Sequence, residues 1–305
     1  MSAVPPGFAF RGPGLDRAEL LRDDPARLDA LWPSARVLVV DAEGLARFPR
    51  PPRETAPATG AEAMPGDVAQ RGDSLSSARP AEASLLGLDG DTAWFVLPHE
   101  ALAAPLDGRL GLREAAATWP ALPAAALAQA RALLHWQHRH RYCGACGQAV
   151  QRARAGYSAR CPGCQLEHYP RTDPAVIVAV SDGRRLLLGR QASWPAGRWS
   201  VLAGFVEPGE SLEQALVREV MEEASVPVLS TCYSASQPWP FPGSLMVGFH
   251  ALGEPVEPKV SDELEQARWF TRAELEAAVA AGEVTLSPRL SISRTLIEEW
   301  LAQQG

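Results

Sequence analysis

The sequence has no apolar run long enough to cross a membrane. Its longest runs, such as PAVIVAV at residues 174–180, are far shorter than the roughly 20 residues that span a bilayer. The first residues also lack the basic-then-apolar layout of a secretion signal. We therefore expect a cytoplasmic protein that has no membrane partner.

Cysteine and excess positive charge are also scarce. Only five cysteines occur among 305 residues, and four of them lie close together. The net charge of -7 argues against a surface built to coat nucleic acid, although a local basic cleft is compatible with an acidic total. No repeat of fixed period occurs, so a repeat architecture is excluded.

The length and the composition together predict two lobes. A chain of 305 residues with 46% hydrophobic content exceeds the roughly 250 residues at which a single core usually stops growing. We assign residues 1–139 to an N-terminal α/β lobe with a strand at residues 35–40 and a helix at 123–140. Residues 50–84 are rich in Pro, Ala, Gly and Ser and poor in large apolar side chains, so we predict a mobile insertion there.

Four cysteines form two pairs with the spacing C-x2-C-x14-C-x2-C. They are Cys143, Cys146, Cys161 and Cys164. Two such pairs build the tetrahedral set of four thiolates that is typical of a closed structural zinc site. Disulfides or a redox pair are the alternative, which an intracellular setting disfavours. We predict a zinc ribbon over residues 140–168 that holds one structural Zn²⁺, with His168 as a less favoured substitute ligand.

A predicted helix over residues 211–224 carries three closely spaced carboxylates. Glu219, Glu222 and Glu223 are related by i, i+3 and i+4, so their side chains share one side of the helix, away from Leu212 and Leu216. Like charges placed in this way repel each other, and a solvated charged face is the plain alternative. A site for Mg²⁺ or Mn²⁺ would instead turn the repulsion into coordination.

The spacing around this helix resembles the Nudix box. Gly204 is followed after five residues by Glu210, and after seven more by REVMEEASV at residues 218–226, where the family pattern is G-x5-E-x7-R-E-U-x-E-E-x-G-U. Ser225 departs from the pattern, because the family has Gly there in a left-handed cap. The resemblance implies an α/β/α sandwich with a mixed sheet over residues 169–305. It also implies metal-dependent hydrolysis of a nucleoside diphosphate joined to another moiety.

The same resemblance implies roles for individual residues. The ligands for up to three Mg²⁺ or Mn²⁺ ions would be Glu219, Glu222, Glu223, Glu263 and the backbone carbonyl of Ala203. Glu223 would also deprotonate the attacking water. Arg218 and Glu210 are expected to form an ion pair that holds the loop against the helix. For Glu263, a plain exposed surface carboxylate is the alternative.

The stretch SQPWPFPGS at residues 236–244 narrows the family. Its three prolines stiffen a backbone that presents two aromatic side chains, although an ordinary Pro-rich loop is the alternative. The stretch resembles the S-Q-P-W-P-F-P-x-S signature of the NADH pyrophosphatase branch of the Nudix superfamily. The paired cysteines, YPR-DPAVI, the box and this stretch follow one another in that family's order. The implied substrate-binding residues are Gln237, Pro238, Trp239, Pro240, Phe241, Pro242, Gly243 and Ser244.

Four further residues match family positions near the substrate. Tyr169 and Phe205 would offer aromatic faces to a base or a nicotinamide ring, with a place in the core as the alternative. Ser293 would be a small residue near the substrate. Arg113 would reach toward phosphate, with a plain surface arginine as the alternative.

Together these features predict an α+β enzyme that consists of an N-terminal α/β lobe, a zinc ribbon and a Nudix domain. The resemblance implies hydrolysis of the pyrophosphate bond of NADH or NAD⁺ to nicotinamide mononucleotide and AMP by a homodimer. Removal of NAD caps from RNA 5′ ends is an alternative, because the same bond is cut. A non-catalytic module that senses a ligand or binds nucleic acid is an alternative of another class, which the intact three-glutamate face disfavours.

Overall fold

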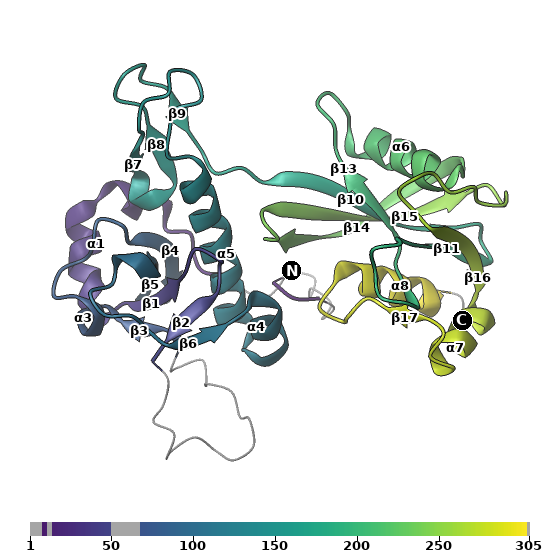
Figure 1. Ribbon diagram of the computed structural model, residues 1–305, viewed down its shortest axis with the longest axis horizontal. Coiled ribbons are helices and arrows are strands. Elements are labelled where there is room, and N and C mark those ends of the chain that lie inside the picture. The colour runs from purple at the N-terminus through teal and green to yellow at the C-terminus, as the bar shows by residue number, and fades with distance from the viewer. Residues whose placement is uncertain (1–7, 11–13, 50–67, 304–305) are drawn as a thin grey trace, which may run out of the picture. The chain divides into compact units, whose positions relative to one another are not determined.

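The computed structural model describes residues 8–10, 14–49 and 68–303, and it divides into two compact units (Figure 1). The N-terminal unit comprises Phe10–Arg171 together with the short segment Pro240–Gly243. The C-terminal unit comprises Thr172–Trp239 and the chain from Ser244 onward, with Ala9. The four-cysteine ribbon therefore belongs to the same unit as the N-terminal lobe.

A mixed six-stranded sheet forms the centre of the N-terminal unit. The strand order is β4-β5-β1-β2-β6, with β3 also paired to β1, and only the β1–β5 pair is parallel. The strands are β1 (Arg36–Val40), β2 (Ala46–Phe48), β3 (Gln70–Arg71), β4 (Ser84–Asp89), β5 (Thr92–Pro98) and β6 (Gly108–Leu110). The α-helices are α1 (Pro25–Leu31), α3 (Gly72–Leu75), α4 (Leu112–Thr118) and α5 (Ala121–Arg139). Short 3₁₀ helices are η1 (Glu19–Asp23), η2 (Trp32–Ser34), η3 (His99–Ala101) and η4 (Arg154–Gly156).

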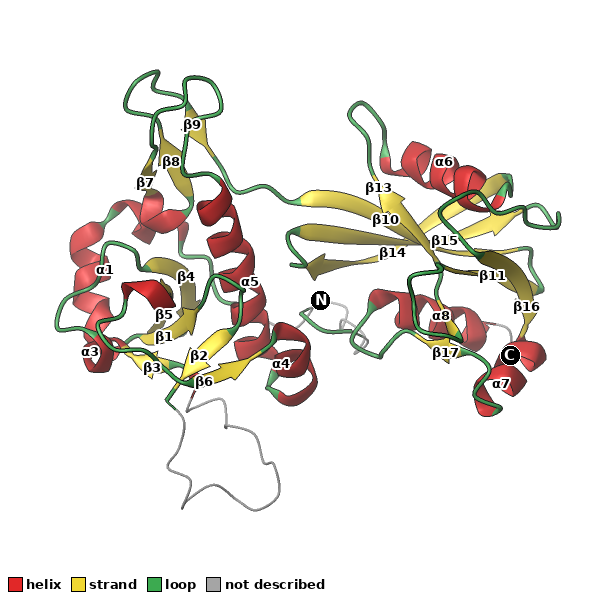
Figure 2. Cartoon of the chain, in the orientation of Figure 1, coloured by secondary structure: helices red, strands yellow, loops and turns green. Residues whose placement is uncertain are grey.

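Both faces of this sheet are covered, which explains why its central strands are continuously apolar. On β1, Leu38 and Val40 belong to the core that includes Leu127 of α5, whereas Val37 belongs to a second core with Leu28 of α1. Successive side chains of a strand point to opposite faces, so adjacent residues supply different cores. Figure 2 shows the helix α5 running beside the sheet.

The ribbon follows α5 directly and forms a three-stranded antiparallel sheet. Its strands are β7 (Gln151–Ala153), β8 (Ser158–Arg160) and β9 (Glu167–His168). Ala159 of β8 is buried in the same core as α5, and Val150 and Tyr157 pack against that core. The ribbon is therefore fixed to the N-terminal sheet by apolar contacts.

The predicted mobile insertion needs a correction. Residues 50–67 lie outside the described residues, but residues 68–84 are packed into the N-terminal unit. Val68 is 1% exposed, β3 pairs with β1, and the Trp32 indole N–H donates to the Ser76 carbonyl at 3.0 Å. Gly72 lies so close to the Trp32 carbonyl that an added Cβ would come within 1.9 Å of its oxygen. A few specific contacts order a segment whose composition alone predicts mobility.

The C-terminal unit is built on a second mixed sheet. The strand order is β14-β15-β10-β11-β16, with β13 also paired to β10, and the β10–β15 pair is parallel. The strands are β10 (Asp173–Ser181), β11 (Arg185–Arg190), β12 (Arg198–Trp199), β13 (Leu202–Phe205), β14 (Val228–Trp239), β15 (Ser244–Gly253), β16 (Gln266–Thr271) and β17 (Thr285–Leu286). The helices are α6 (Leu212–Ala224), α7 (Arg272–Ala280) and α8 (Ile292–Gln303).

The central strand β10 separates two cores. Val176 and Val178 pack with residues of α6, whereas Ile177 and Ala179 pack with residues of α8. Figure 1 shows α6 and α8 on opposite faces of the sheet. This arrangement is the α/β/α sandwich with a mixed sheet that the sequence predicts, and the α+β fold class is confirmed. No helix in the described part of the chain is long and apolar enough to cross a membrane.

Gln237 of β14 is a structural residue in this fold. Its side chain is 0% exposed. The amide nitrogen donates to the carbonyls of Ala9 at 3.0 Å and Leu290 at 2.7 Å, and its oxygen accepts from the N–H of Ile292 at 2.8 Å. The prediction that Gln237 contacts substrate does not fit this placement, because the buried amide already joins three segments of the chain.

Ser293 of α8 is buried, and its place near the substrate stays a prediction. Its side chain is 2% exposed, and its hydroxyl forms a hydrogen bond with the Ser200 hydroxyl at 2.8 Å. The residue is small, as predicted, but it lies inside the C-terminal unit and not at an open surface.

Replacing Gln237 with Ala tests this structural role. The change would leave the Ala9 carbonyl and the Ile292 N–H without partners, whereas the Leu290 carbonyl keeps the Ala9 N–H, so we expect a loss of about 3 kcal/mol in the free energy of unfolding. Urea denaturation measures the loss. The control Gln266→Ala, on the exposed side of β16, should stay within about 0.5 kcal/mol of the parent protein. Equal stability of the two variants would contradict the structural role.

Candidate active site

The helix α6 carries the three clustered glutamates and is well defined at its start. The Ser211 hydroxyl accepts from the N–H of Gln214 at 3.2 Å, and the Gln214 side chain accepts from the N–H of Ser211 at 2.8 Å. This reciprocal pair is a capping box. Leu216 and Val220 are fully buried against the sheet. Capping and burial together fix where the helix begins and which face it turns inward.

Ser225 ends the helix in the left-handed conformation that the family's Gly would adopt, with φ of 55°. A non-glycine residue in this region costs roughly 1–2 kcal/mol. Two contacts offset the cost, because the Ser225 hydroxyl donates to the Lys259 carbonyl at 3.1 Å and the Lys259 N–H donates to the Ala224 carbonyl at 2.9 Å. Ser225 therefore ends the helix in the same conformation as the family's Gly, although the residue differs.

Two of the three glutamates point inward. Glu219 is 9% exposed and Glu223 is 3% exposed, whereas Glu222 is exposed. Among the described residues, the Oε2 atom of Glu223 has no hydrogen-bond partner and no contact with solvent. The alternative of a solvated charged face thus fits Glu222 only. A buried carboxylate oxygen without a partner is costly unless a cation neutralises it.

Gly204 makes room for the Glu219 carboxylate. The residue lies on β13 opposite Val176 of β10. A Cβ at this position would lie 1.8 Å from the Cδ atom of Glu219 and about as close to both of its oxygens. Any larger residue would displace the carboxylate, which gives a physical reason for the glycine of the box.

Arg218 links the glutamates to the preceding loop. Its Nε and Nη2 atoms donate to the two oxygens of Glu210 at 2.6 and 2.9 Å, which is the predicted ion pair. Its Nη1 atom donates to Glu219 and to Glu222, both at 2.9 Å, and Nη2 also donates to the Phe205 carbonyl at 2.9 Å. One guanidinium therefore orients two glutamates while it fixes the loop.

The electrostatic environment separates these carboxylates by pKa. Bonds from Arg218 lower the pKa of Glu210 to about 2. Burial, followed by the charges of Glu219 and Glu263, raises the pKa of Glu223 to about 8, against a backbone hydrogen bond from Ala203. Burial also raises the pKa of Glu219, although Arg218 opposes the rise. Since Glu263 acts on both buried glutamates, the structure brings it near them from outside the helix.

The predicted substrate stretch is divided between the two units. Pro238 is exposed and Trp239 is half-buried in β14, and Ser244, also half-buried, begins β15. Phe241 lies in the N-terminal unit and packs against its core. Within the segment 240–243, Pro240 is buried, Pro242 is exposed and Gly243 is half-buried.

Two arginines flank the Phe241 ring. The guanidinium carbon of Arg113 lies 4.3 Å from the ring centroid, and that of Arg131 lies 4.9 Å from it. Arg113 was predicted to lie near substrate, but Arg131 was not. The two are distant in sequence, and Arg131 sits in an apolar helix where no motif marks it.

Tyr169 and Phe205 are surface aromatics. Tyr169 is 55% exposed and donates its hydroxyl hydrogen bond to Glu167, while Phe205 is 60% exposed. The alternative that they belong to the core is therefore wrong. Both have free ring surface, and their contact with a base or nicotinamide ring stays a prediction.

The four cysteines of the ribbon form one cluster. All four sulfur atoms lie within 4.8 Å of one another, with Cys143 Sγ 3.6 Å from Cys164 Sγ and Cys146 Sγ 3.3 Å from Cys161 Sγ. Backbone N–H groups, chiefly that of Cys164, lower the pKa of Cys161 to about 6 and so favour the thiolate that binds metal. His168 is not part of this cluster. The donor set fits a four-sulfur zinc site.

Comparison with known proteins identifies the family. Residues 171–290 match the family model described as the NUDIX domain, and residues 138–169 match the NADH pyrophosphatase zinc ribbon domain. A Mycobacterium bovis protein named NAD-capped RNA hydrolase NudC (strain BCG / Pasteur 1173P2) is 39% identical over 95% of this chain and 93% of its own length. The chain belongs to the NudC family of Nudix hydrolases.

Two further relatives cover smaller shares. A Stutzerimonas stutzeri protein, also named NAD-capped RNA hydrolase NudC, is 48% identical over 55% of this chain and 59% of its own length. Human NAD-capped RNA hydrolase NUDT12 is 38% identical over 70% of this chain and 51% of its own length. Membership of the NudC family confirms the resemblance and the predicted enzyme class, and it disfavours the non-catalytic module.

Gly204→Ala tests the close approach of Glu219. The added methyl group would push the carboxylate away by an ångström or more, so we expect kcat/KM to fall by about 10². Steady-state kinetics of NADH hydrolysis with Mn²⁺ measure the change in kcat/KM. The matched control is Gly111→Ala, whose new Cβ would meet only Leu45 at 3.8 Å. Unchanged activity in Gly204→Ala would contradict the packing argument.

Cys161→Ser tests the ribbon. Loss of one thiolate from a closed four-sulfur site should reduce the zinc content from one atom per chain to a small fraction and lower the unfolding temperature. Elemental analysis of reduced protein measures the zinc. Cys232→Ser, an exposed cysteine outside the cluster, should keep the full content. Equal zinc content in both variants would argue against the site.

Proposed function

We propose that this NudC-family enzyme hydrolyses the diphosphate bond of NAD by divalent-metal chemistry on the buried face of α6. The observation that carries the proposal is the partnerless, buried Oε2 atom of Glu223, which lies beside Glu219 and within the electrostatic reach of Glu263. A site of this kind is costly without a bound cation and favourable with one. The bond between the two phosphates is the one that gives nicotinamide mononucleotide and an adenosine 5′-phosphate.

The residues present fit Mg²⁺ or Mn²⁺, since the donor set consists of carboxylate oxygens. Glu219, Glu222, Glu223 and Glu263 would hold up to three ions, with the Ala203 carbonyl beside them. The bound ions would neutralise the diphosphate oxygens and make water a better nucleophile. Two of these ligands are already oriented by the chain, because Arg218 donates to Glu219 and Glu222 and Gly204 leaves room for the Glu219 carboxylate.

Glu223 is our candidate to accept the proton of the attacking water. Burial raises the pKa of its carboxyl to about 8 when no metal is bound, so this buried carboxylate has a higher proton affinity than an exposed glutamate. Arg218 acts differently, since it contacts Glu210 on one side and two glutamates on the other. Arg218 and Glu210 are positioning residues in this proposal.

The substrate is recognised by aromatic and cationic groups. Phe205 and Tyr169 have exposed rings that would stack on a base or nicotinamide. Trp239 and Phe241, with Pro238, Pro240, Pro242, Gly243 and Ser244, would line the pocket. The Arg113 guanidinium over Phe241 would face phosphate.

We propose NAD at the 5′ end of RNA as a substrate, together with free NADH and NAD⁺. The names of the relatives specify NAD-capped RNA, and the matching zinc ribbon is named for NADH pyrophosphatases. The same phosphate–phosphate bond is cut in every case. The expected homodimer and the cytoplasmic location stay predictions.

A substrate panel tests this function. NADH, NAD⁺, ADP-ribose and NAD-capped RNA are incubated with Mn²⁺, and the products are identified by mass. We expect nicotinamide mononucleotide with AMP from free NAD(H), and nicotinamide mononucleotide with 5′-monophosphate RNA from the capped RNA. If neither NAD(H) nor capped RNA releases nicotinamide mononucleotide, the proposal is wrong.

Glu223→Gln tests the general base. We expect kcat to fall by at least about 10², because an amide accepts no proton from water. The zinc content should stay the same. The matched control is Glu213→Gln, an exposed glutamate on the same helix, which should keep full activity. Retained turnover in Glu223→Gln would remove this residue from the mechanism.

A further inference from the structure

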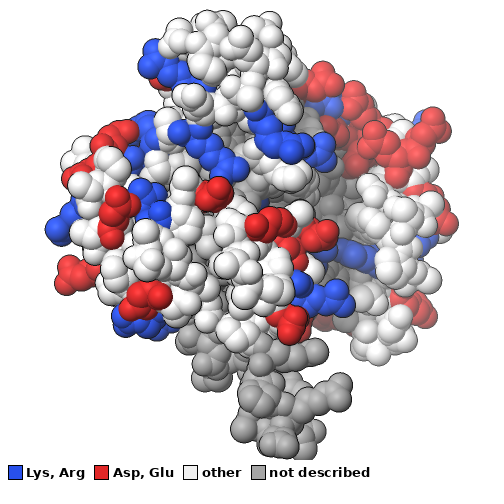
Figure 3. Space-filling model, turned by 60° about the vertical axis from the view of Figure 1, so that its left-hand side comes forward, with Lys and Arg blue, Asp and Glu red and all other residues white. Residues whose placement is uncertain are grey.

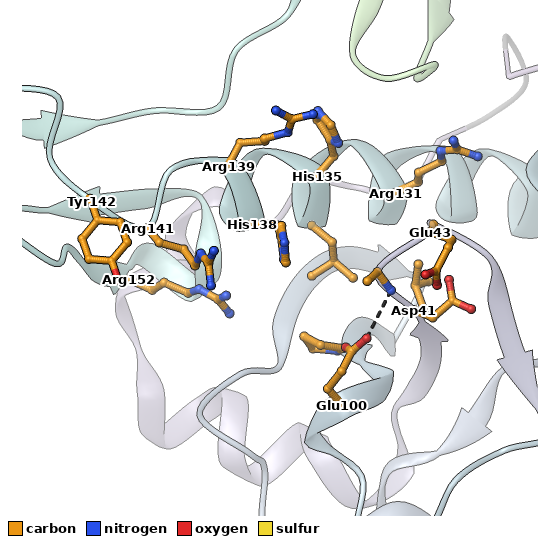
Figure 4. Close-up of a pocket in the computed structure, with 15 residues that line it drawn as sticks. Asp41, Glu43, Glu100, Arg131, His135, His138, Arg139, Arg141, Tyr142 and Arg152 are labelled. Atoms are coloured by element: carbon orange, nitrogen blue, oxygen red, sulfur yellow. Dashed lines mark hydrogen bonds between the residues drawn. The ribbon is translucent and has the colours of Figure 1, made fainter.

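A pocket of about 660 Å³ lies wholly within the N-terminal unit (Figure 4). It is bounded by the C-terminal part of α5, by the turn between β1 and β2, and by the first residues of the ribbon. None of the predicted active-site residues lines it. The glutamates of α6 thus do not line it, although Arg131, which does, also contacts the ring of Phe241.

One side of the pocket is strongly basic. Arg131 and Arg139 come from α5, while Arg141 and Arg152 come from the ribbon. Figure 4 shows Arg141 and Arg152 extending toward the same space as His138. Within the described part of the chain, none of these four arginines forms an ion pair with a carboxylate. Unpaired guanidiniums are therefore gathered at one place on a chain whose net charge is -7.

The carboxylates on the opposite side are already engaged with the turn. Asp41 accepts from the N–H of Leu45 at 2.8 Å and pairs with Arg47 at 3.7 Å. Glu100 accepts from the N–H of Ala42 at 3.2 Å, the bond drawn in Figure 4. These contacts hold the turn in shape, and none of them provides an ion-pair partner for Arg139, Arg141 or Arg152.

Burial and neighbouring positive charge disfavour the charged forms of two residues that line the pocket. Burial lowers the pKa of Arg131, and the charge of Arg113 lowers it further, although Asp41 opposes the change. Burial likewise lowers the pKa of His135, followed by the charges of Arg139 and Arg131. An anion in the pocket would relieve this repulsion, and arginine forks match the two oxygens of a phosphate.

An exposed aromatic ring accompanies the arginines. Tyr142 lines the pocket, is 65% exposed and follows Arg141 directly in the chain. Figure 3 shows basic side chains gathered beneath the tip of the ribbon on the face that it presents. Arginines that track a phosphate backbone, beside an aromatic face on which a base can stack, are the two features of single-strand nucleic-acid sites.

We propose that this pocket binds the phosphate backbone of single-stranded RNA. The identity of this RNA rests on the proposed function: the bound RNA is the chain that continues beyond the NAD cap. Besides Arg131, whose guanidinium lies over Phe241, three arginines line the pocket, and they exceed what the single phosphate of a mononucleotide engages, which favours a polymer. A free nucleotide also offers a phosphate to the arginines, and the test below distinguishes this ligand from RNA.

The test measures binding of a fluorescent single-stranded RNA with a 5′-hydroxyl end, which carries no diphosphate to hydrolyse. The variant Arg141→Ala/Arg152→Ala is compared with the control Arg109→Ala/Arg184→Ala, which removes the same charge at exposed positions outside the pocket. We expect the pocket variant to bind RNA about tenfold more weakly and the control to bind unchanged. The slope of log K against log salt should fall by about 1.4 in the pocket variant, since each single-strand phosphate contact contributes about 0.7.

Activity assays distinguish this proposal from the proposed function. The pocket variant should keep the kcat/KM of the parent on free NAD⁺ and lose about tenfold on NAD-capped RNA through KM. If the enzyme cleaved neither substrate, the binding assay on 5′-hydroxyl RNA would still decide the pocket's role. Zinc content and unfolding temperature equal to those of the parent show that the variant is folded.

Two results would overturn the proposal. One is equal RNA affinity for the pocket variant and the control. The other is that AMP, at the concentration that saturates the pocket, displaces the bound RNA completely and that the affinity for RNA does not increase with its length. This result would assign the pocket to a free nucleotide.

Discussion

The structure depends most on one constraint, which is the burial of the Glu219 and Glu223 carboxylates on α6. Glu219 and Glu223 lie on the inner side of α6, where water cannot fully solvate them and where they repel each other. Three features keep them there in the absence of a cation. Gly204 leaves the space, Arg218 supplies one positive charge, and the apolar positions of α6 fix the helix on the sheet. A folded state that retains this cost is prepared for a divalent ion.

The surrounding fold supplies the rigidity that such a site needs. The strand β10 is buried on both faces, with α6 on one side and α8 on the other, so the sheet beneath the glutamates cannot shift without disturbing two cores. The capping box at Ser211 and the left-handed end at Ser225 set both limits of α6. Side chains held by packing and by neighbouring hydrogen bonds keep their geometry when a ligand binds.

Local sequence patterns predicted those features that depend on residues close together in the chain. Helical periodicity placed α6 and paired cysteines placed the ribbon, whereas the ion pair of Arg218 with Glu210 was implied by the resemblance to the Nudix box. Contacts between distant segments could not be predicted in this way. Gln237 belongs to a family signature, yet its amide is consumed by residues that only the folded chain brings together. The packing of residues 68–84 likewise depends on contacts with β1 and with Trp32 that the composition does not reveal.

The most direct measurement is the unfolding temperature of the parent protein and of Glu223→Gln, each with and without Mn²⁺. If the buried carboxylates are retained to hold cations, the variant should unfold at a higher temperature than the parent when no Mn²⁺ is present and the pH lies above the Glu223 pKa of about 8, because a buried charge has then been removed. Added Mn²⁺ should stabilise the parent strongly and the variant little. An equal rise in both proteins would contradict the account.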